Sequence, residues 1–143
     1  MTAFTKPTGP FTNDELRAYI ETMMLFAVAD GTVRKAELNM VQMTVVGYLE
    51  SHPSLEGMTR QQLIDLCFEC ANAIYDEGPA ARLTKGAAIL STEQQRMFAL
   101  SMAAAVAGAD GYIQTGERAG FALLQRAFGL TVEQVRWAIE AFD

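Results

Sequence analysis

The chain has 143 residues, half of them apolar, so it is long enough to bury one sizeable core as a single domain. Its formal charge of −6 and the scatter of its eleven Lys and Arg residues argue against a nucleic-acid partner, because a phosphate backbone would be repelled. No apolar run reaches the roughly 20 residues that cross a bilayer, and none resembles a signal-peptide core. With only two cysteines, these features predict a cytoplasmic protein without a transmembrane segment.

Residues 1–11 contain two prolines and no continuous apolar stretch, which predicts a flexible tail ahead of one domain over 12–143. Helix starts within the domain are marked by capping boxes. In a capping box a Ser or Thr is followed three residues later by Glu or Gln, and two free backbone amides are satisfied at once. The boxes are Thr12 with Glu15, Thr59 with Gln62, Ser91 with Gln94 and Thr131 with Gln134.

Behind these starts, apolar residues recur every three or four positions, which is the spacing of an amphipathic helix. No stretch alternates in the manner of a strand. We expect helices over 13–29, 34–51, 60–76, 92–109, 115–128 and 132–142, and a short helix with a loop over 79–90. The predicted fold class is all-α, a compact single-domain bundle of six to seven helices.

The chain also contains an internal repeat, which a shift of eighty residues reveals. The shift superposes Asp30-Gly31 on Asp110-Gly111 and pairs apolar positions in the flanking helices. The apolar pairs are Ile20 with Leu100, Ala27 with Ala107, Val41 with Phe121 and Tyr48 with Phe128. We therefore predict two helix-loop-helix repeats related by a pseudo-twofold axis, one over about 13–51 and one over about 92–128.

Each repeat carries two acidic residues around its loop. Asp30 and Asp110 stand at the end of the first helix. Glu37 and Glu117 are expected near the third position of the next helix, where a carboxylate faces free amides and the positive end of the helix dipole. The motif equals the second half of an EF-hand loop, but the first and third ligand positions of that loop hold residues without side-chain oxygens here, so an EF-hand is not expected.

The four acids Asp30, Glu37, Asp110 and Glu117 allow two interpretations. In the first, each Glu stabilises a helix start and each Asp ties down its turn. In the second, the twofold brings both loops together into an acidic cluster that binds a hard divalent cation (Ca, Mg, Mn or Zn) or docks a basic partner. The two interpretations are compatible with each other.

The loops resemble the signature of the TerB-like family of tellurite-resistance-associated proteins, in which an apolar helix ends in Ala-Asp-Gly and an aliphatic residue and a Glu follow. The matching segments are 28–33 with Glu37 and 108–113 with Glu117. The step over 128–131 into the last helix is similar to the family's Leu-Gly-Leu-Ser, with Phe128 where the family often has Leu.

The resemblance implies a compact all-α fold with internal pseudo-twofold symmetry and a role in resistance to tellurite and other chemical stress. Relatives fused to J-domain co-chaperones and to membrane-associated assemblies imply protein partners, and the paired acids correspond to a candidate metal site. No catalytic activity is implied. The predicted function is a non-enzymatic adaptor or binding domain. The alternatives are a metal-assisted enzyme that uses the same carboxylates, and a structural scaffold in which they only cap helices.

The remaining residues with reactive side chains are assigned to packing. Cys67-x-x-Cys70 has the spacing of a zinc or redox half-site, but both cysteines lie on the apolar stripe of the helix expected over 60–76. His52 is the single histidine, so a zinc site would lack ligands. No nucleophile motif or phosphate loop is present.

Overall fold

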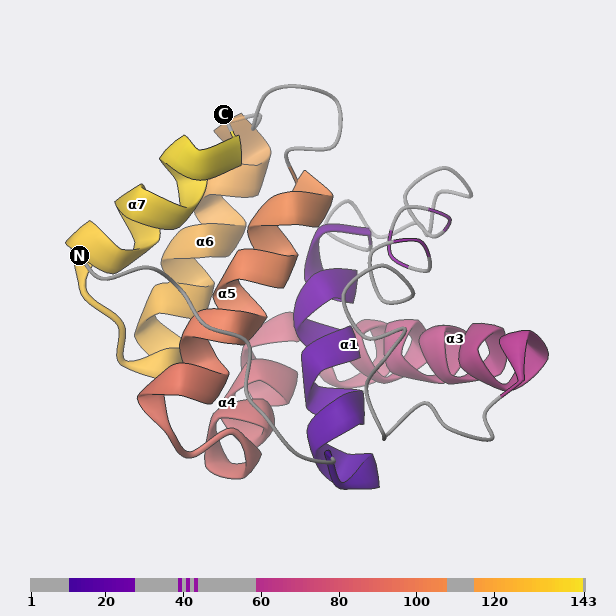
Figure 1. Cartoon of the computed structure of the whole chain (residues 1–143). Helices are drawn as coiled ribbons and strands as arrows, with labels where there is room; N and C mark the ends of the chain where they lie inside the picture. Colours follow the sequence, from indigo (N-terminus) through magenta and orange to yellow (C-terminus); the bar gives the residue numbers. More distant parts are fainter. Residues whose placement is uncertain are drawn as a thin grey trace.

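The computed structural model describes residues 11–27, 39, 41, 43, 59–107 and 115–142, with the backbone alone at 26, 27, 60, 115–117 and 142. Within these ranges all regular structure is helical, which confirms the all-α prediction for the described part of the chain. Figure 1 shows the helices packed into one compact body.

The helices are α1 (Asn13–Ala27), α3 (Arg60–Glu77), α4 (Pro79–Ile89), α5 (Glu93–Ala107), α6 (Thr115–Phe128) and α7 (Val132–Phe142). Asn39, Val41 and Met43, between α1 and α3, are also helical. The expected helices over 60–76, 115–128 and 132–142 are confirmed to within one residue. Parts of the other expected helices lie outside the described residues. These parts are the last residues of the helices expected over 13–29 and 92–109, and most of the helix expected over 34–51.

The segment expected as a short helix with a loop is a full helix, α4, of 11 residues. Pro79 begins it, and a proline is well placed there because the first turn of a helix does not use its amide. The turn before it is made by Gly78, whose φ of 90° favours glycine. Gly78-Pro79 therefore separates two helices and does not interrupt one.

Three of the four predicted capping boxes are confirmed. The side chains of Thr12, Thr59 and Thr131 each accept the amide of the residue three positions later, and the Glu or Gln there accepts the threonine amide. The box expected at Ser91 is wrong by one residue, because α5 is capped by Thr92 with Gln95. The Ser91 amide instead donates to the carbonyl of Ile89 at 3.1 Å, so Ser91 belongs to the turn that follows α4.

Helix ends are closed as specifically as helix starts. Gly129, with a φ of 64°, ends α6 in the left-handed conformation, and the Leu130 amide returns to the carbonyl of Gln125 at 3.0 Å. The Arg96 guanidinium donates to the carbonyls of Ala87, Leu90 and Phe128 at 2.7, 2.7 and 3.1 Å. One side chain of α5 thus satisfies free carbonyls at the ends of α4 and α6.

The core is centred on α1 and α5. α5 is buried on nearly all sides, as expected for a helix that is apolar all round. Tyr19 on α1 packs edge-on against Phe98 on α5, with the ring centroids 5.0 Å apart. Despite this apolar character, the described part of the chain contains no helix that is both long and apolar enough to cross a membrane.

The structure shows several correspondences at the shift of eighty residues. α1 and α5 begin at Asn13 and Glu93, each directly after a capping threonine. Two of the predicted core pairs, Ile20 with Leu100 and Val41 with Phe121, are buried at all four positions. The loops that join the helices of each predicted repeat lie outside the described residues.

Candidate functional site

The predicted acidic site falls largely outside the described residues. Asp30, Glu37 and Asp110 are not described, and only the backbone of Glu117 is. α6 begins at Thr115, which makes Glu117 its third residue and agrees with the helix position predicted for it. Among the described residues no group of three or more His, Cys, Asp or Glu side chains could hold a metal ion. The cation site therefore remains a prediction.

The helices that lead into the two Asp-Gly loops are described. The described part of α1 reaches Ala27 and that of α5 reaches Ala107, each three positions before its loop aspartate. Their N-terminal turns are joined by a hydrogen bond from the Gln95 side-chain amide to the Glu15 carboxylate. Figure 1 shows both helices running in the same general direction, so their C-terminal ends point toward the same end of the molecule.

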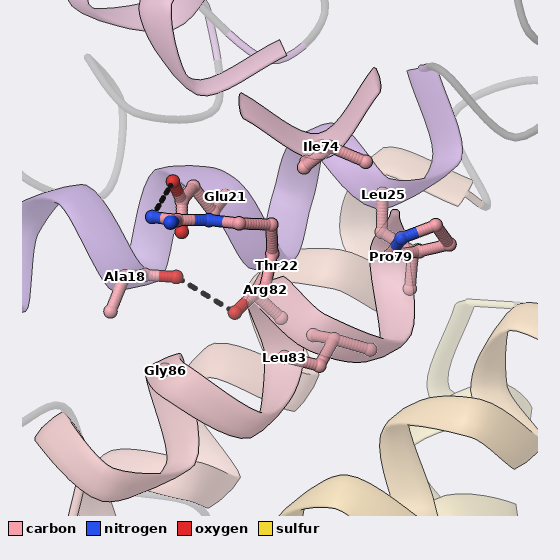
Figure 2. A pocket seen from close by; sticks show the side chains of 9 residues that line it. All are labelled: Ala18, Glu21, Thr22, Leu25, Ile74, Pro79, Arg82, Leu83 and Gly86. Atoms are coloured by element: carbon pink, nitrogen blue, oxygen red, sulfur yellow. Dashed lines mark hydrogen bonds and ion pairs between the residues drawn. The ribbon is translucent and has the colours of Figure 1, made fainter. Parts of the chain in front are cut away.

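A buried charge cluster joins α1 to α4. Glu21 on α1 is only 5% exposed, and one of its carboxylate oxygens accepts a hydrogen bond from the Arg82 guanidinium of α4 at 2.6 Å. Arg17 reaches the same oxygen at 3.3 Å. Figure 2 shows Arg82 lying against Glu21, with the ion pair between them. The hydrogen bond to Glu21 raises the pKa of Arg82 above its ordinary value.

The cluster continues to the surface through Glu77. This carboxylate accepts Arg82 Nη1 at 3.0 Å and Lys85 Nζ at 2.6 Å, and the hydrogen bond from Lys85 is the largest cause that lowers the pKa of Glu77. These residues were not predicted as a cluster from the sequence. The four-residue spacing of Arg17 and Glu21 was the available local signal, because side chains so spaced meet on a helix. No signal in the neighbouring sequence indicates that Glu21 pairs with Arg82.

The hollow beside this cluster is structural. Its cavity volume is about 10 Å³, and the residues that line it, drawn in Figure 2, include Glu21, Thr22, Arg82 and Gly86. The Thr22 hydroxyl donates to the carbonyl of Ala18 at 2.8 Å, and Arg82 Nε has no hydrogen-bond partner. A space of this size holds about one water molecule, so the hollow is too small for an organic substrate.

A larger groove lies between α6 and α7, with a volume of about 360 Å³. It is lined by Arg118, Gln125, Val132, Val135, Arg136, Ile139 and Glu140. The lining combines aliphatic side chains with two arginines and a carboxylate, and it holds no Ser, Cys or His that could serve as a nucleophile or a general base of the usual kind.

The assignment of the cysteines to the core is confirmed. Cys67 and Cys70 are fully buried free thiols on α3. Burial raises the pKa of the Cys67 thiol to about 11. Burial is also the largest cause of the raised pKa of Cys70, and the nearby Glu21 carboxylate adds to it. Both thiols stay protonated at neutral pH, which makes them poor nucleophiles and poor metal ligands.

We expect both thiols to react at least about tenfold more slowly with the disulfide reagent DTNB in the native protein at pH 8 than in urea, because only an exposed thiolate attacks it. The control is Ser91→Cys, which adds a thiol at an exposed turn position. That third thiol should react at once without urea. Equally fast reaction of all three thiols in the native protein would contradict the burial.

Comparison with known proteins shows the fold and no more. No protein-family model matches the chain, and no curated protein matches it. A crystal structure of a protein of unknown function from Porphyromonas gingivalis W83 is similar, with a TM-score of 0.60, 20% sequence identity, and coverage of 99% of this chain and 97% of that one. The two proteins therefore share a small all-α fold over nearly their whole lengths.

Proposed function

We propose that this chain is a non-enzymatic TerB-like adaptor or binding domain. Two related helix pairs present an acidic site, formed by Asp30, Glu37, Asp110 and Glu117, that binds a divalent cation. The proposal rests on the sequence motifs in both loops and on the arrangement of the helices that precede them. The role in resistance to tellurite and related stress is part of the same proposal.

The observation that carries the proposal is the matched pair α1 and α5. The two helices start directly after equivalent capping residues, lie side by side with the Gln95 side chain hydrogen-bonded to Glu15, and run the same way. In each case Asp-Gly begins three positions beyond the last described residue of the helix. Two helices aligned at their starts direct the C-terminal ends of their described parts toward the same end of the bundle, which is what a shared cation site requires.

The chemistry of the four side chains suits a hard cation. Carboxylate oxygens bind Ca²⁺, Mg²⁺ and Mn²⁺ at about 2.0 to 2.6 Å, and four carboxylates supply enough charge to replace part of the ion's water shell. Neutralising this charge would also relieve repulsion in a chain of net charge −6.

The structural scaffold is the second candidate, and one observation favours it. In all four described boxes the Glu or Gln at the third helical position accepts the amide of the capping threonine. If Glu37 and Glu117 do the same, they stabilise helix starts by about 1 kcal/mol each and need no ion.

A metal titration followed by thermal unfolding separates the two candidates. If the loops form a cation site, millimolar Ca²⁺, Mg²⁺, Mn²⁺ or Zn²⁺ raises the Tm, because a ligand that binds only the native state stabilises it by about 2.7 kcal/mol at one hundred times its Kd. For a domain of this size that is a rise of several degrees. Asp30→Asn with Asp110→Asn should abolish the rise.

The matched control is Asp65→Asn with Asp76→Asn, which removes the same charge from exposed positions on α3. This control should keep the full rise in Tm. If none of the four cations moves the melting curve of the wild-type protein, the scaffold interpretation stands. If the Asp65→Asn, Asp76→Asn variant also loses the rise in Tm, the ions act through the net charge of the chain and no specific site exists.

A further inference from the structure

α3 has an exposed aromatic face in addition to its buried side. Its buried residues are Leu63, Cys67, Cys70, Ala71 and Ile74. Phe68 and Tyr75 are 46% and 69% exposed. They stand seven residues apart, so they lie on one face, about 10 Å apart along the helix axis. Two large aromatic side chains aligned on one exposed face are typical of a contact surface.

A row of acids runs beside this aromatic face. Asp65, Glu69 and Asp76 are exposed residues of α3, and the spacings of four and seven residues between them place them in line along the helix. The sequence of α3 contains a single basic residue, Arg60, at its first position, and Glu77 at its last position is paired with Arg82 and Lys85 of α4. The nearest contact of Glu69 with a cation is loose, with Arg17 Nη1 at 3.8 Å. The aromatic face therefore lies in a region of negative potential.

We propose that Phe68 and Tyr75 dock a cationic amphipathic segment of a partner protein. Apolar side chains of that segment pack on the two rings, and its Lys or Arg side chains lie over the acidic row and against the ring faces, where cations are attracted to aromatic rings. Aromatic anchors at the centre of a contact, with a polar rim beside them, are common in protein interfaces.

The negative charge of this face favours a basic partner segment over a second copy of the chain, a membrane surface or a nucleic acid. A second copy of the chain would bring the same acids onto the same face, so two α3 helices repel one another. An anionic membrane surface and a nucleic acid are repelled both by the acidic row and by the net charge of −6. A basic segment is attracted both by the acidic row and by the net negative charge of the chain. The proposal concerns a different surface from the cation site and stands or falls independently of it.

The test uses the full chain and a fluorescein-labelled cationic helical peptide built from Lys, Leu and Ala, with a version carrying Glu in place of Lys as its control. Fluorescence anisotropy should show binding of the cationic peptide and none of the acidic one. Phe68→Ala with Tyr75→Ala should weaken the binding at least about tenfold, the scale expected when anchor residues are truncated. Asp65→Asn with Asp76→Asn should weaken it too and flatten its dependence on salt.

Two controls locate the binding. Ile89→Ala removes an exposed aliphatic side chain from α4 and should leave the affinity unchanged. Asp30→Asn with Asp110→Asn should also leave it unchanged, whereas that variant abolishes the proposed cation effect. The two proposals therefore fail in different variants.

Three results would overturn the proposal. One is equal affinity of the cationic peptide for the wild type and the Phe68→Ala, Tyr75→Ala variant. Another is a fall in the Tm of that variant by more than about 5 °C, because exposed substitutions cost little and a larger fall would mean that the chain itself covers this face. The third is a dimer in sedimentation equilibrium that the same substitutions dissolve, which would make a second copy the occupant.

Discussion

Arg82→Met is expected to lower the free energy of unfolding by about 3 kcal/mol, because it leaves a buried carboxylate without its closest partner. Glu21 is 5% exposed and holds Arg82 Nη2 at 2.6 Å, whereas Arg17 lies farther away at 3.3 Å and is more exposed. Arg82 also joins α1 to Glu77 at the end of α3. Urea unfolding at pH 7, followed by circular dichroism, measures the change through the midpoint and slope.

The matched control is Lys85→Met, which breaks the exposed ion pair with Glu77. Exposed ion pairs contribute little to stability because water and salt screen them, so this variant should unfold close to the wild type. Glu21→Leu added to Arg82→Met should recover much of the lost stability, since no buried charge is then left alone. Equal losses in the Arg82 and Lys85 variants would show that the buried pair contributes no more than a surface pair.

Phe98→Ala is expected to lower the free energy of unfolding by about 3 to 5 kcal/mol, because it opens a cavity where α1 meets α5. Phe98 is fully buried, and its ring lies 5.0 Å from that of Tyr19 and 6.2 Å from that of Phe11. These rings are the aromatic part of the contact that holds the two matched helices together. Urea unfolding again measures the loss.

Phe68→Ala provides the comparison, because it is the same substitution at a position that is 46% exposed. It should cost about 0.5 kcal/mol or less. Phe98→Leu, which keeps most of the apolar volume, should fall between the two variants and remain folded if Phe98→Ala does not. A loss at Phe98 no larger than that at Phe68 would contradict a core centred on α1 and α5.

Local signals predicted most of the helices. Thr12, Thr59 and Thr131 start helices where their boxes indicate, since a capping box satisfies backbone amides within four residues and needs no distant partner. The error at Ser91 arose because Ser91 and Thr92 are each followed three residues later by glutamine, so two overlapping boxes are possible. The register of α5 decides between them, and Arg96 holds that register through carbonyls of α4 and α6.

The charge cluster could not be predicted in the same way. Arg17 and Glu21 have helical spacing, but Arg82 is 61 residues from Glu21, and their pairing depends on how α4 crosses α1. The exposure of Phe68 and Tyr75 is likewise set by which neighbours α3 meets. A helical pattern indicates the apolar side of a helix, whereas the surface left uncovered follows from the tertiary arrangement.

The acidic site was proposed from motifs in the two loops, and the structure adds the helices that precede them. α1 and α5 begin at capping boxes that a hydrogen bond from Gln95 to Glu15 joins, a relation that the sequence alone suggests only through the shift of eighty residues. The positions of the four carboxylates depend on loop residues outside the described part of the chain.

The shared cation site is tested most directly by a crystal structure of the full chain grown with Mn²⁺, whose anomalous scattering locates the ion. We predict one ion between the loops, with oxygens of Asp30 and Asp110 each about 2.0 to 2.6 Å from it and hence within about 5 Å of one another. Carboxylates of Asp30 and Asp110 separated by more than about 10 Å, with no ion between them, would contradict the proposal.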